Sequence, residues 1–288
     1  MLKIGIPKGS LQDATIDLFA RAGYRVTLPK RSYYPQIDHP DMECIMFRSQ
    51  EMSRYVEDGV VDLGICGHDW VIENGSDVHE VCELPYSRAT SKPAKWVLAV
   101  PEESGVQSPE DLADGIVATE LVGTTQRYFD DRGIKLRKME FSWGATEVKA
   151  RLIDAIVDIT ETGSSLVANK LRVLDTILES TTRLIANHDA WADPKRRQMI
   201  EDLQLLLTGA TAAKDLVGLK LNASRADLDA ILGALPAAQS PTVNDLADPD
   251  WVAVEIIVSR RVERDLIPTL HRAGARAIFT YPLHQVIA

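Results

Sequence analysis

The stretch from Asp154 to Leu166, DAIVDITETGSSL, constrains the fold and the chemistry of this chain more than any other. It begins as an apolar run that carries Asp154 and Asp158, continues through a hydroxyl-rich turn at 160–165, and ends at the first turn of a helix. A strand, a small polar turn and a helix start are typical of phosphate sites, because backbone N–H groups and the helix dipole converge on an anion there. Gly163 would let the main chain approach the ligand closely, since glycine has no Cβ.

The acidic residues of this stretch need a separate explanation, because carboxylates repel phosphate. Asp154, Asp158 and Glu161 suit a ligand that also carries ribose hydroxyls or Mg²⁺, both of which bind carboxylate oxygen. The stretch therefore favours a ribose phosphate over bare phosphate. An ordinary strand-to-helix connection, in which Ser and Thr only cap the helix, is the alternative that the local sequence leaves open.

The charge of the chain argues against nucleic acid as its main partner. The net charge is −10, so no basic excess exists to neutralise a phosphate backbone, and an anionic small molecule would need a local basic cluster. The three cysteines have no metal-type spacing, and the six histidines form no ligand pattern, so we expect no zinc. The N-terminus starts as a strand without a secretory signal, and no apolar run approaches the roughly 20 residues of a membrane span. We expect a cytoplasmic protein with no membrane partner.

The first part of the chain alternates strands and helices around turns that could bind an anion. In order, the apolar periodicity predicts a strand, a helix, a strand, a helix and a strand at 2–6, 11–22, 43–47, 51–59 and 60–66. Lys8 lies in the turn after the first strand, and Arg48 lies at the carboxyl end of the second, where ligands bind in open α/β sheets. Residues 25–40 between them are expected to form a substrate-facing loop. Both cations could equally be solvated or paired at the surface.

A second set of alternating elements begins near residue 93. The predicted elements are strands at 96–100, 115–119 and 134–139, and helices that begin at 108 and cover 124–132 and 147–152. Residues 175–187 would return the chain to the first set. We therefore predict two α/β lobes with a cleft between them, the first formed by 1–92 with 182–212 and the second by 93–181.

The C-terminal part follows a different pattern. Asp193 and Pro194 are the N-cap and first residue of a long predicted helix. The region 213–288 then shows the βαββαβ order of a ferredoxin-like domain, with elements at 216–221, 225–235, near 242, 251–258, 262–273 and 277–281. Nothing in this region has a catalytic pattern, so a regulatory or assembly role is expected.

Taken together, these segments resemble the long form of ATP phosphoribosyltransferase, the first enzyme of histidine biosynthesis. The similarity covers nearly the whole chain and is most specific in collinear segments at 7–11 (PKGSL), 58–67 (DGVVDLGICG), 144–147 (GATE), 154–166, and 240–242 (SPT) with 246–253 (LADPDWVA). The resemblance implies a two-lobed fold like that of periplasmic binding proteins. It also implies a C-terminal domain that binds histidine as feedback inhibitor, and a homo-oligomer of dimers and hexamers.

The implied reaction joins N1 of ATP to C1 of phosphoribosyl pyrophosphate and releases pyrophosphate, with Mg²⁺ present. Catalysis would depend on positioning and charge stabilisation without a protein nucleophile. We assign phosphoribosyl pyrophosphate to Asp154, Asp158, Thr160, Glu161, Thr162, Gly163, Ser164 and Ser165, with Asp154 and Asp158 on ribose hydroxyls or Mg²⁺. By resemblance, the catalytic residues facing phosphates or the nucleotide are Lys8, Arg31, Arg48 and Glu147. Also by resemblance, the nucleotide side of the cleft contains Ser10, Gly64, Gly67 and Asp69.

The chain departs from the pattern of the family at a few positions. Many members carry Arg where this chain has Ser10, and Ser165 replaces the usual Thr but keeps the hydroxyl. The residues that match the histidine site are Ser224, Ser240, Thr242 and Ala277. Some members have Asp where this chain has Ser224, and a missing carboxylate would weaken the hold on an α-amino group. We therefore expect histidine inhibition with reduced affinity.

Two other functions remain open on the sequence. A sensor of the same two-lobed fold would bind a small molecule without chemistry, but it has no need of a ribose-phosphate loop. A phosphoribosyltransferase that uses a different base would be expected to have two adjacent acids on a single-domain fold. Here the acids are spaced and a third domain is present, so ATP phosphoribosyltransferase is the favoured function.

Overall fold

The computed structural model describes residues 1–30, 32–86, 93–236 and 240–287, so the predicted site residue Arg31 lies outside the described residues. The chain forms two compact units. One contains Met1–Ala20 and Tyr24–Gln204, and the other contains Arg21–Gly23 and Leu205–Ala288. The boundary falls inside the long helix α8 (Pro194–Ala213), so this one helix belongs to both units.

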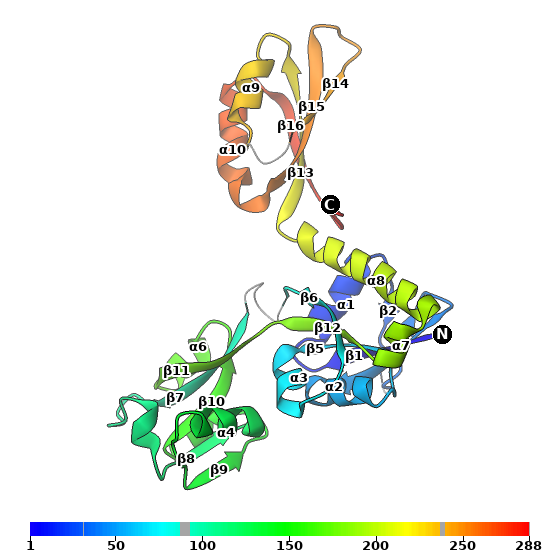
Figure 1. Ribbon diagram of the computed structural model, residues 1–288. Helices are drawn as coiled ribbons and strands as arrows, with labels where there is room; N and C mark the ends of the chain where they lie inside the picture. Colours follow the sequence, from blue (N-terminus) through cyan, green and yellow to red (C-terminus); the bar gives the residue numbers. More distant parts are fainter. Residues whose placement is uncertain (31, 87–92, 237–239, 288) are drawn as a thin grey trace. The chain divides into compact units, whose positions relative to one another are not determined.

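The larger unit contains two separate sheets, each of which forms the centre of a lobe (Figure 1). In spatial order, the sheet of the first lobe consists of β4 (Met42–Arg48), β1 (Leu2–Lys8), β5 (Leu63–Gly67), β12 (Thr182–Ala186) and β6 (His79–Leu84). Its helices are α1 (Gln12–Arg21), α2 (Ser49–Glu57), α3 (His68–Asn74) and α7 (His188–Ala192). The strands β4, β1 and β5 run parallel, and their nearly continuous apolar runs are typical of strands that are covered on both faces.

The second lobe has its own mixed sheet. In spatial order, its strands are β11 (Leu171–Ser180), β7 (Ala94–Pro101), β10 (Ala155–Thr160), β8 (Ile116–Thr119) and β9 (Lys138–Phe141). Its helical elements are the 3₁₀ helix η1 (Pro109–Leu112), α4 (Val122–Asp130), α5 (Thr146–Lys149) and α6 (Ser164–Ala168). A core that includes Trp96, Leu98 and Phe129 packs against one face of this sheet.

The chain crosses between the lobes twice. The first crossing lies between β6 and β7, and the second is the single residue Thr181 between β11 and β12. The prediction that residues 175–187 return the chain to the first lobe is therefore confirmed.

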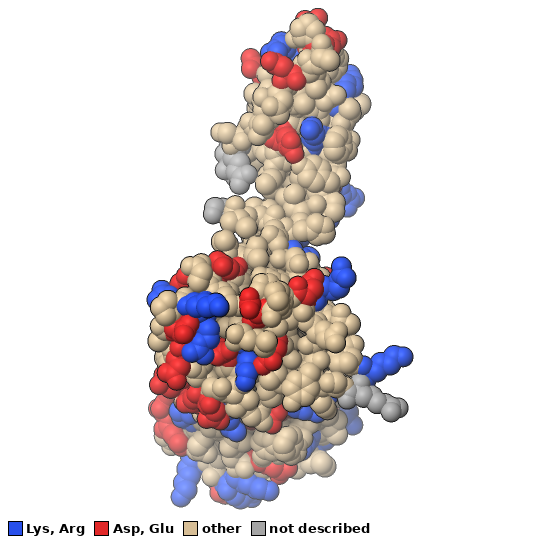
Figure 2. Space-filling model, turned by 90° about the vertical axis from the view of Figure 1, so that its right-hand side faces the viewer, with Lys and Arg blue, Asp and Glu red and all other residues tan. Residues whose placement is uncertain are grey.

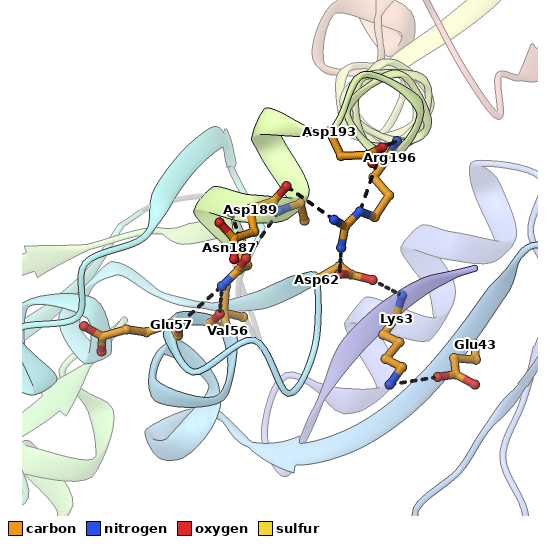
Figure 3. Close-up of polar contacts among 10 residues, drawn as sticks. Lys3, Glu43, Val56, Glu57, Asp62, Asn187, Asp189, Asp193 and Arg196 are labelled. Atoms are coloured by element: carbon orange, nitrogen blue, oxygen red, sulfur yellow. Dashed lines mark hydrogen bonds and ion pairs between the residues drawn. The ribbon is translucent and has the colours of Figure 1, made fainter.

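A polar network fixes the start of α8 to the first lobe (Figure 3). Asp62, between α2 and β5, accepts hydrogen bonds from the backbone N of Lys3 and from the Arg196 guanidinium, both at 2.9 Å. Asn187 caps α7 and donates through its side chain to the carbonyl of Val56 at 2.9 Å. Asp193 accepts from the backbone N of Arg196 at 2.8 Å, as expected for the predicted N-cap. The long helix therefore begins at a position that the first lobe determines.

The smaller unit contains a four-stranded antiparallel sheet with two helices. In spatial order, the strands are β14 (Thr242–Asp245), β15 (Trp251–Ser259), β13 (Leu216–Ser224) and β16 (Arg276–Pro282). The helices α9 (Leu228–Ala234) and α10 (Arg260–Arg272) pack on a core that includes Leu219, Val254 and Leu270. The chain order βαββαβ is the one predicted, and the ferredoxin-like arrangement is confirmed.

Some predicted elements differ from the structure. Residues 25–40 were expected to be a loop, but they contain the two-stranded ribbon of β2 (Val26–Thr27) and β3 (Gln36–Ile37). The helix expected at 147–152 is only the single turn α5, because the chain must turn again to begin β10 at Ala155. The strand expected at 134–139 begins later, as β9.

The surface is consistent with the acidic composition. On the face shown in Figure 2, Lys and Arg side chains alternate with Asp and Glu side chains and form no continuous basic surface. No helix within the described ranges is both long and apolar enough to cross a membrane.

Candidate functional site

A cavity of about 850 Å³ in the larger unit is lined by both lobes. The first lobe contributes the ends of β1 and β4 and the β5–α3 junction, and the second lobe contributes the end of β10 and the loop before α6. The predicted site residues that line it are Lys8, Ser10, Arg48, Gly67, Asp69, Glu147, Asp158, Thr160, Glu161, Thr162, Ser164 and Ser165. A hollow of about 480 Å³ beside α4 contains no predicted site residue.

The loop between β10 and α6 is organised by its own hydroxyl groups. The backbone N of Gly163 donates to Thr160 Oγ1 at 2.8 Å, and the hydroxyls of Thr162 and Ser164 lie 2.9 Å apart. Gly163 has φ +75°, and a Cβ built there would meet no atom within 4 Å, so the backbone conformation and not crowding favours glycine. Thr162, Ser164 and Ser165 therefore place hydroxyl groups at the cavity wall, at the start of α6.

Two cations lie on the opposite side of the cavity. Lys8 and Arg48 are the last residues of β1 and β4, and the parallel pairing of these strands places them in register. The ammonium of Lys8 lies 3.9 Å from the centroid of the Tyr33 ring, and its hydrogen bond and charge lower the pKa of the Tyr33 hydroxyl. The sheet therefore places two positive charges beside each other at its carboxyl edge, as predicted for an anionic ligand.

Four carboxylates line the same cavity from the second lobe. They are Asp158 on β10, Glu161 in the loop after it, Glu147 on α5 and Glu120 after β8. Burial raises the pKa of Asp158 to about 7, and Glu147, which shares a hydrogen bond with it, adds to the shift. Burial likewise raises the pKa of Glu120, although Gln50 donates to it at 3.4 Å and Arg48 lies near it. Ser165 Oγ donates to Glu147 Oε1 at 2.7 Å. The cavity thus holds negative charge that its own cations do not fully neutralise.

The raised pKa of Asp158 predicts a pH-dependent stability. The folded-state pKa is above the ordinary value of 3.8, so the contribution of Asp158 to stability is full below pH 3.8 and is lost as the pH rises through 7. An Asp158→Asn variant cannot ionise, so its stability relative to the parent protein should rise by about 2–3 kcal/mol between pH 5 and pH 8. Urea unfolding at the two pH values measures this change. A stability difference that is the same at both pH values would contradict the assignment.

Two predicted site residues do not line the cavity, and a third lies inside its loop. Asp154 precedes β10, at the opposite end of the strand from Thr160, and its carboxylate accepts from the backbone N of Ile116 at 2.8 Å. Its proposed contact with ribose or Mg²⁺ is therefore not supported. Gly64 lies within β5, where a Cβ would come 2.7 Å from Val56 and 2.9 Å from Met52, so packing explains this glycine. Gly163 lies inside the loop between lining residues.

The structure does not bring the predicted metal pair together. Asp154 and Asp158 are separated by four positions of one strand, which is about 13 Å at the usual rise per residue. Among residues 1–30, 32–86, 93–236 and 240–287, no group of three or more His, Cys, Asp or Glu side chains is placed to hold a metal ion.

Several lining residues were missed on the sequence. Glu120 follows β8 at the carboxyl end of a strand that runs parallel to β10, so the rule that ligands bind at carboxyl ends could have identified it. Trp96, Tyr86 and Ser180 also line the cavity; Trp96 and Ser180 lie in strands whose pattern indicates no site, and Tyr86 follows β6 without a motif around it.

The residues assigned to histidine lie on three strands of the smaller unit or beside them. Ser224 ends β13 and pairs with Trp251, whereas Thr242 pairs with Glu255 four positions away along β15. Ala277 lies in β16 with φ +46°, and Ser240 precedes β14. The hydroxyl of Ser224 donates to Asp227 Oδ2 at 2.8 Å. A carboxylate is therefore present beside the position where some members of the resembling family carry Asp.

Comparisons with known proteins identify the family of the chain. A family model described as ATP phosphoribosyltransferase matches residues 48–209, and one described as HisG, C-terminal domain, matches residues 213–285. The solved ATP phosphoribosyl transferase (HisG:HisZ) complex from Thermotoga maritima superposes with a TM-score of 0.61 at 30% identity, covering 72% of this chain and 99% of that chain.

Curated relatives match over the full chain. The ATP phosphoribosyltransferase of Pelodictyon phaeoclathratiforme (strain DSM 5477 / BU-1) is 53% identical over 100% of this chain and 98% of its own length. The ATP phosphoribosyltransferase of Solibacter usitatus (strain Ellin6076) is 51% identical over 100% of this chain and 99% of its own length. With both domains matched and identity above half along the whole chain, the chain belongs to the ATP phosphoribosyltransferase family.

Proposed function

We propose that this protein transfers the 5-phosphoribosyl group of phosphoribosyl pyrophosphate to N1 of ATP with release of pyrophosphate, the first step of histidine biosynthesis. Family membership supports the reaction, which is that of a pentosyltransferase within the glycosyltransferases. The observation that carries the proposal is the cavity itself. In it, a loop of hydroxyl and N–H donors on β10–α6 faces two cations on β1 and β4. Since these substrates are metabolites of the cytoplasm, we place the reaction there.

The two sides of the cavity suit the two anionic ends of phosphoribosyl pyrophosphate. The loop residues Thr160–Ser165 offer donors to the 5′-phosphate, as strand–turn–helix sites do. Asp158 lies directly before this loop, where its carboxylate can accept hydrogen bonds from ribose hydroxyls. Lys8 and Arg48 would receive the pyrophosphate, whose negative charge grows as the bond to C1 breaks.

This division of roles accounts for the reaction without a covalent intermediate. The transition state has positive character on the ribose ring and negative charge on the leaving group. Carboxylates near the ring and cations near the leaving group match this charge distribution, so positioning and charge stabilisation supply the catalysis. Glu147 and the β5–α3 junction at Gly67, together with Ser10, are proposed to form the nucleotide side.

The residues present fit Mg²⁺ if the metal is bound together with substrate phosphate. Mg²⁺ is commonly held by one or two carboxylates plus phosphate oxygens and water, and Asp158 with Glu147 provides such a pair. Burial and, after it, the charge of Glu147 raise the pKa of Asp158, and a divalent cation beside the two carboxylates would favour their charged forms. When bound, Mg²⁺ would neutralise charge on the pyrophosphate. Asp154 has no part in this site.

An assay with ATP, phosphoribosyl pyrophosphate and Mg²⁺, with pyrophosphatase to draw the reaction forward, tests the proposal. The ultraviolet absorbance of the N1-ribosylated adenine nucleotide should rise with Mg²⁺ and stay flat when the metal is chelated. Binding of either substrate without product would point to a two-lobed sensor or to a phosphoribosyltransferase with a different base.

We also propose that histidine inhibits the enzyme through the smaller unit and that the chain forms a homo-oligomer. The resemblance at Ser240, Thr242 and Ala277 supports the inhibitor, and exposed apolar side chains such as Trp143 and Leu152 support self-association. Ser224 in place of Asp predicts weaker histidine binding, although Asp227 lies beside it. Titration calorimetry should therefore give a dissociation constant well above the low-micromolar range. Low-micromolar binding would show that Asp227 replaces the missing carboxylate.

A further inference from the structure

Asp69 is a buried carboxylate of the first lobe whose two side-chain partners, Trp96 and Ser180, both lie in the second lobe. It stands in the first turn of α3 and its side chain is 3% exposed, although it contributes to the cavity wall. Trp96 Nε1 donates to Asp69 Oδ2 at 2.6 Å, and Ser180 Oγ donates to Asp69 Oδ1 at 2.9 Å. The backbone N of Asp69 donates in turn to Ser180 Oγ at 3.0 Å.

The two partners of Asp69 belong to the strands that enter and leave the second lobe. Trp96 lies near the start of β7, directly after the first crossing, and Ser180 is the last residue of β11, directly before the second. The two strands pair with each other, with Trp96 opposite Leu178. One carboxylate therefore ties the first strand and the last strand of the second lobe, β7 and β11, to a helix of the first lobe.

The neighbouring glycine makes room for this arrangement. A Cβ on Gly67 would lie 2.0 Å from Asp69 Oδ1 and 3.4 Å from Ser180 Oγ. No side chain fits at that distance, so the Asp69 carboxylate occupies the volume that a side chain at position 67 would need. Gly67 at the end of β5 is thus explained by the carboxylate that folds back over it.

Two further residues of α3 contact the second lobe. Glu73, one turn after Asp69, accepts hydrogen bonds from the backbone N of Gly123 and of Thr124, both at 2.8 Å, at the start of α4. Trp70 packs against the apolar core of the second lobe, with its ring 6.2 Å from that of Trp96 in an edge-to-face arrangement. These contacts make α3 the element of the first lobe that is joined to the second lobe at several points.

We propose that Asp69 is a positioning residue of the transferase. By holding Trp96 and Ser180 it fixes the two strands that border the lobe crossings. It thereby fixes the distance across the cavity between the cations that end β1 and β4 and the loop between β10 and α6. The inference rests on the proposed function, because both substrates must reach across that span to react. A displacement of the order of 1 Å in such a site lowers the rate by about 10²-fold. In the alternative role, the Asp69 carboxylate would accept a hydrogen bond directly from the nucleotide.

The test compares two site variants, Asp69→Asn and Trp96→Phe. The second keeps an aromatic ring but removes the indole donor. Trp191→Phe on α7 is the matched control for the loss of an indole. We expect both site variants to lower kcat by about 10- to 100-fold with KM for ATP changed less than threefold. The double variant should lose no more than the worse single variant, because the two residues act through one hydrogen bond. A raised KM for ATP in Asp69→Asn, with Trp96→Phe unaffected, would overturn the proposal in favour of direct nucleotide binding.

Two measurements keep the inference testable when a variant folds poorly or the assay fails. Glu73→Gln leaves the cavity lining intact but weakens the second contact of α3, so kcat should fall without a change in KM. In ¹⁵N spectra, the indole N–H signal of Trp96 is assigned as the one that disappears in Trp96→Phe. In the parent protein this signal should shift on addition of phosphoribosyl pyrophosphate. In Asp69→Asn the shift should be absent. An unchanged response in Asp69→Asn would reject the positioning role whether or not the protein shows transferase activity.

Discussion

Replacing Thr162 by valine and Ser165 by alanine together should lower kcat/KM for phosphoribosyl pyrophosphate by about 10³-fold. Each substitution removes one hydroxyl donor from the loop before α6 and leaves the backbone N–H groups in place. A hydrogen bond to a charged group contributes about 1.5–3 kcal/mol, so the loss of two corresponds to roughly 10²- to 10⁴-fold. Steady-state kinetics with varied phosphoribosyl pyrophosphate measure the effect.

A matched substitution separates the loss of the loop hydroxyls from a loss of activity caused by a disturbed fold. Thr176→Val on β11 changes the same residue type at an exposed position that does not line the cavity, and it should leave kcat/KM within about twofold. The melting temperature of the double variant should stay close to that of the parent protein, because the hydroxyls of Thr162 and Ser165 are exposed. Full activity in the double variant would remove the loop from the proposed site.

An Arg48→Met variant should lower kcat by about 10²-fold and have a smaller effect on the KM for ATP. Arg48 lies beside Lys8 through the β1–β4 register, and together they face the loop across the cavity. Since negative charge on pyrophosphate grows in the transition state, a cation beside it stabilises that state more than the bound substrate. Methionine keeps much of the apolar stem but removes the charge.

The control for this variant is Arg54→Met, an exposed arginine on the adjacent helix α2 that does not line the cavity. Its activity should remain within about twofold of the parent protein, because screened charge at the surface contributes little. Equal losses in Arg48→Met and Arg54→Met would indicate that the total charge of the first lobe, and not a cation at the cavity, controls the rate.

The sequence allowed much of the order of the elements, and the turn between β10 and α6, to be predicted, because both depend on local signals. Apolar periodicity identified most of the strands and the long helix α8, but not β6, β11 or β12, and the run of hydroxyls around Gly163 identified the turn between β10 and α6. The position of Asp154 could also have been anticipated. A residue that precedes a strand lies at its amino end, about 13 Å from a residue four positions later.

Contacts between distant segments could not be predicted in the same way. The helix α4 begins at Val122, earlier than predicted, because Glu73 of the other lobe accepts from its first N–H groups while no side chain of its own segment caps it. The Asp69–Trp96 pair joins residues that are 27 positions apart, and neither has a periodic signature. Such pairs become visible only when the two lobes are placed together.

The division of α8 between the two compact units has a consequence for how the protein folds. Ile200 and Leu203 are buried on the half of α8 that belongs to the larger unit, and Leu207 and Ala210 are buried on the half that belongs to the smaller one. Since helix formation has a costly nucleus and then propagates at little cost, whichever unit orders its half first provides the nucleus for the other. We therefore expect the two units to share one helix nucleation event. In the intact chain the two units should unfold in one coupled transition. A cut within α8 should uncouple them and broaden the unfolding transition of each.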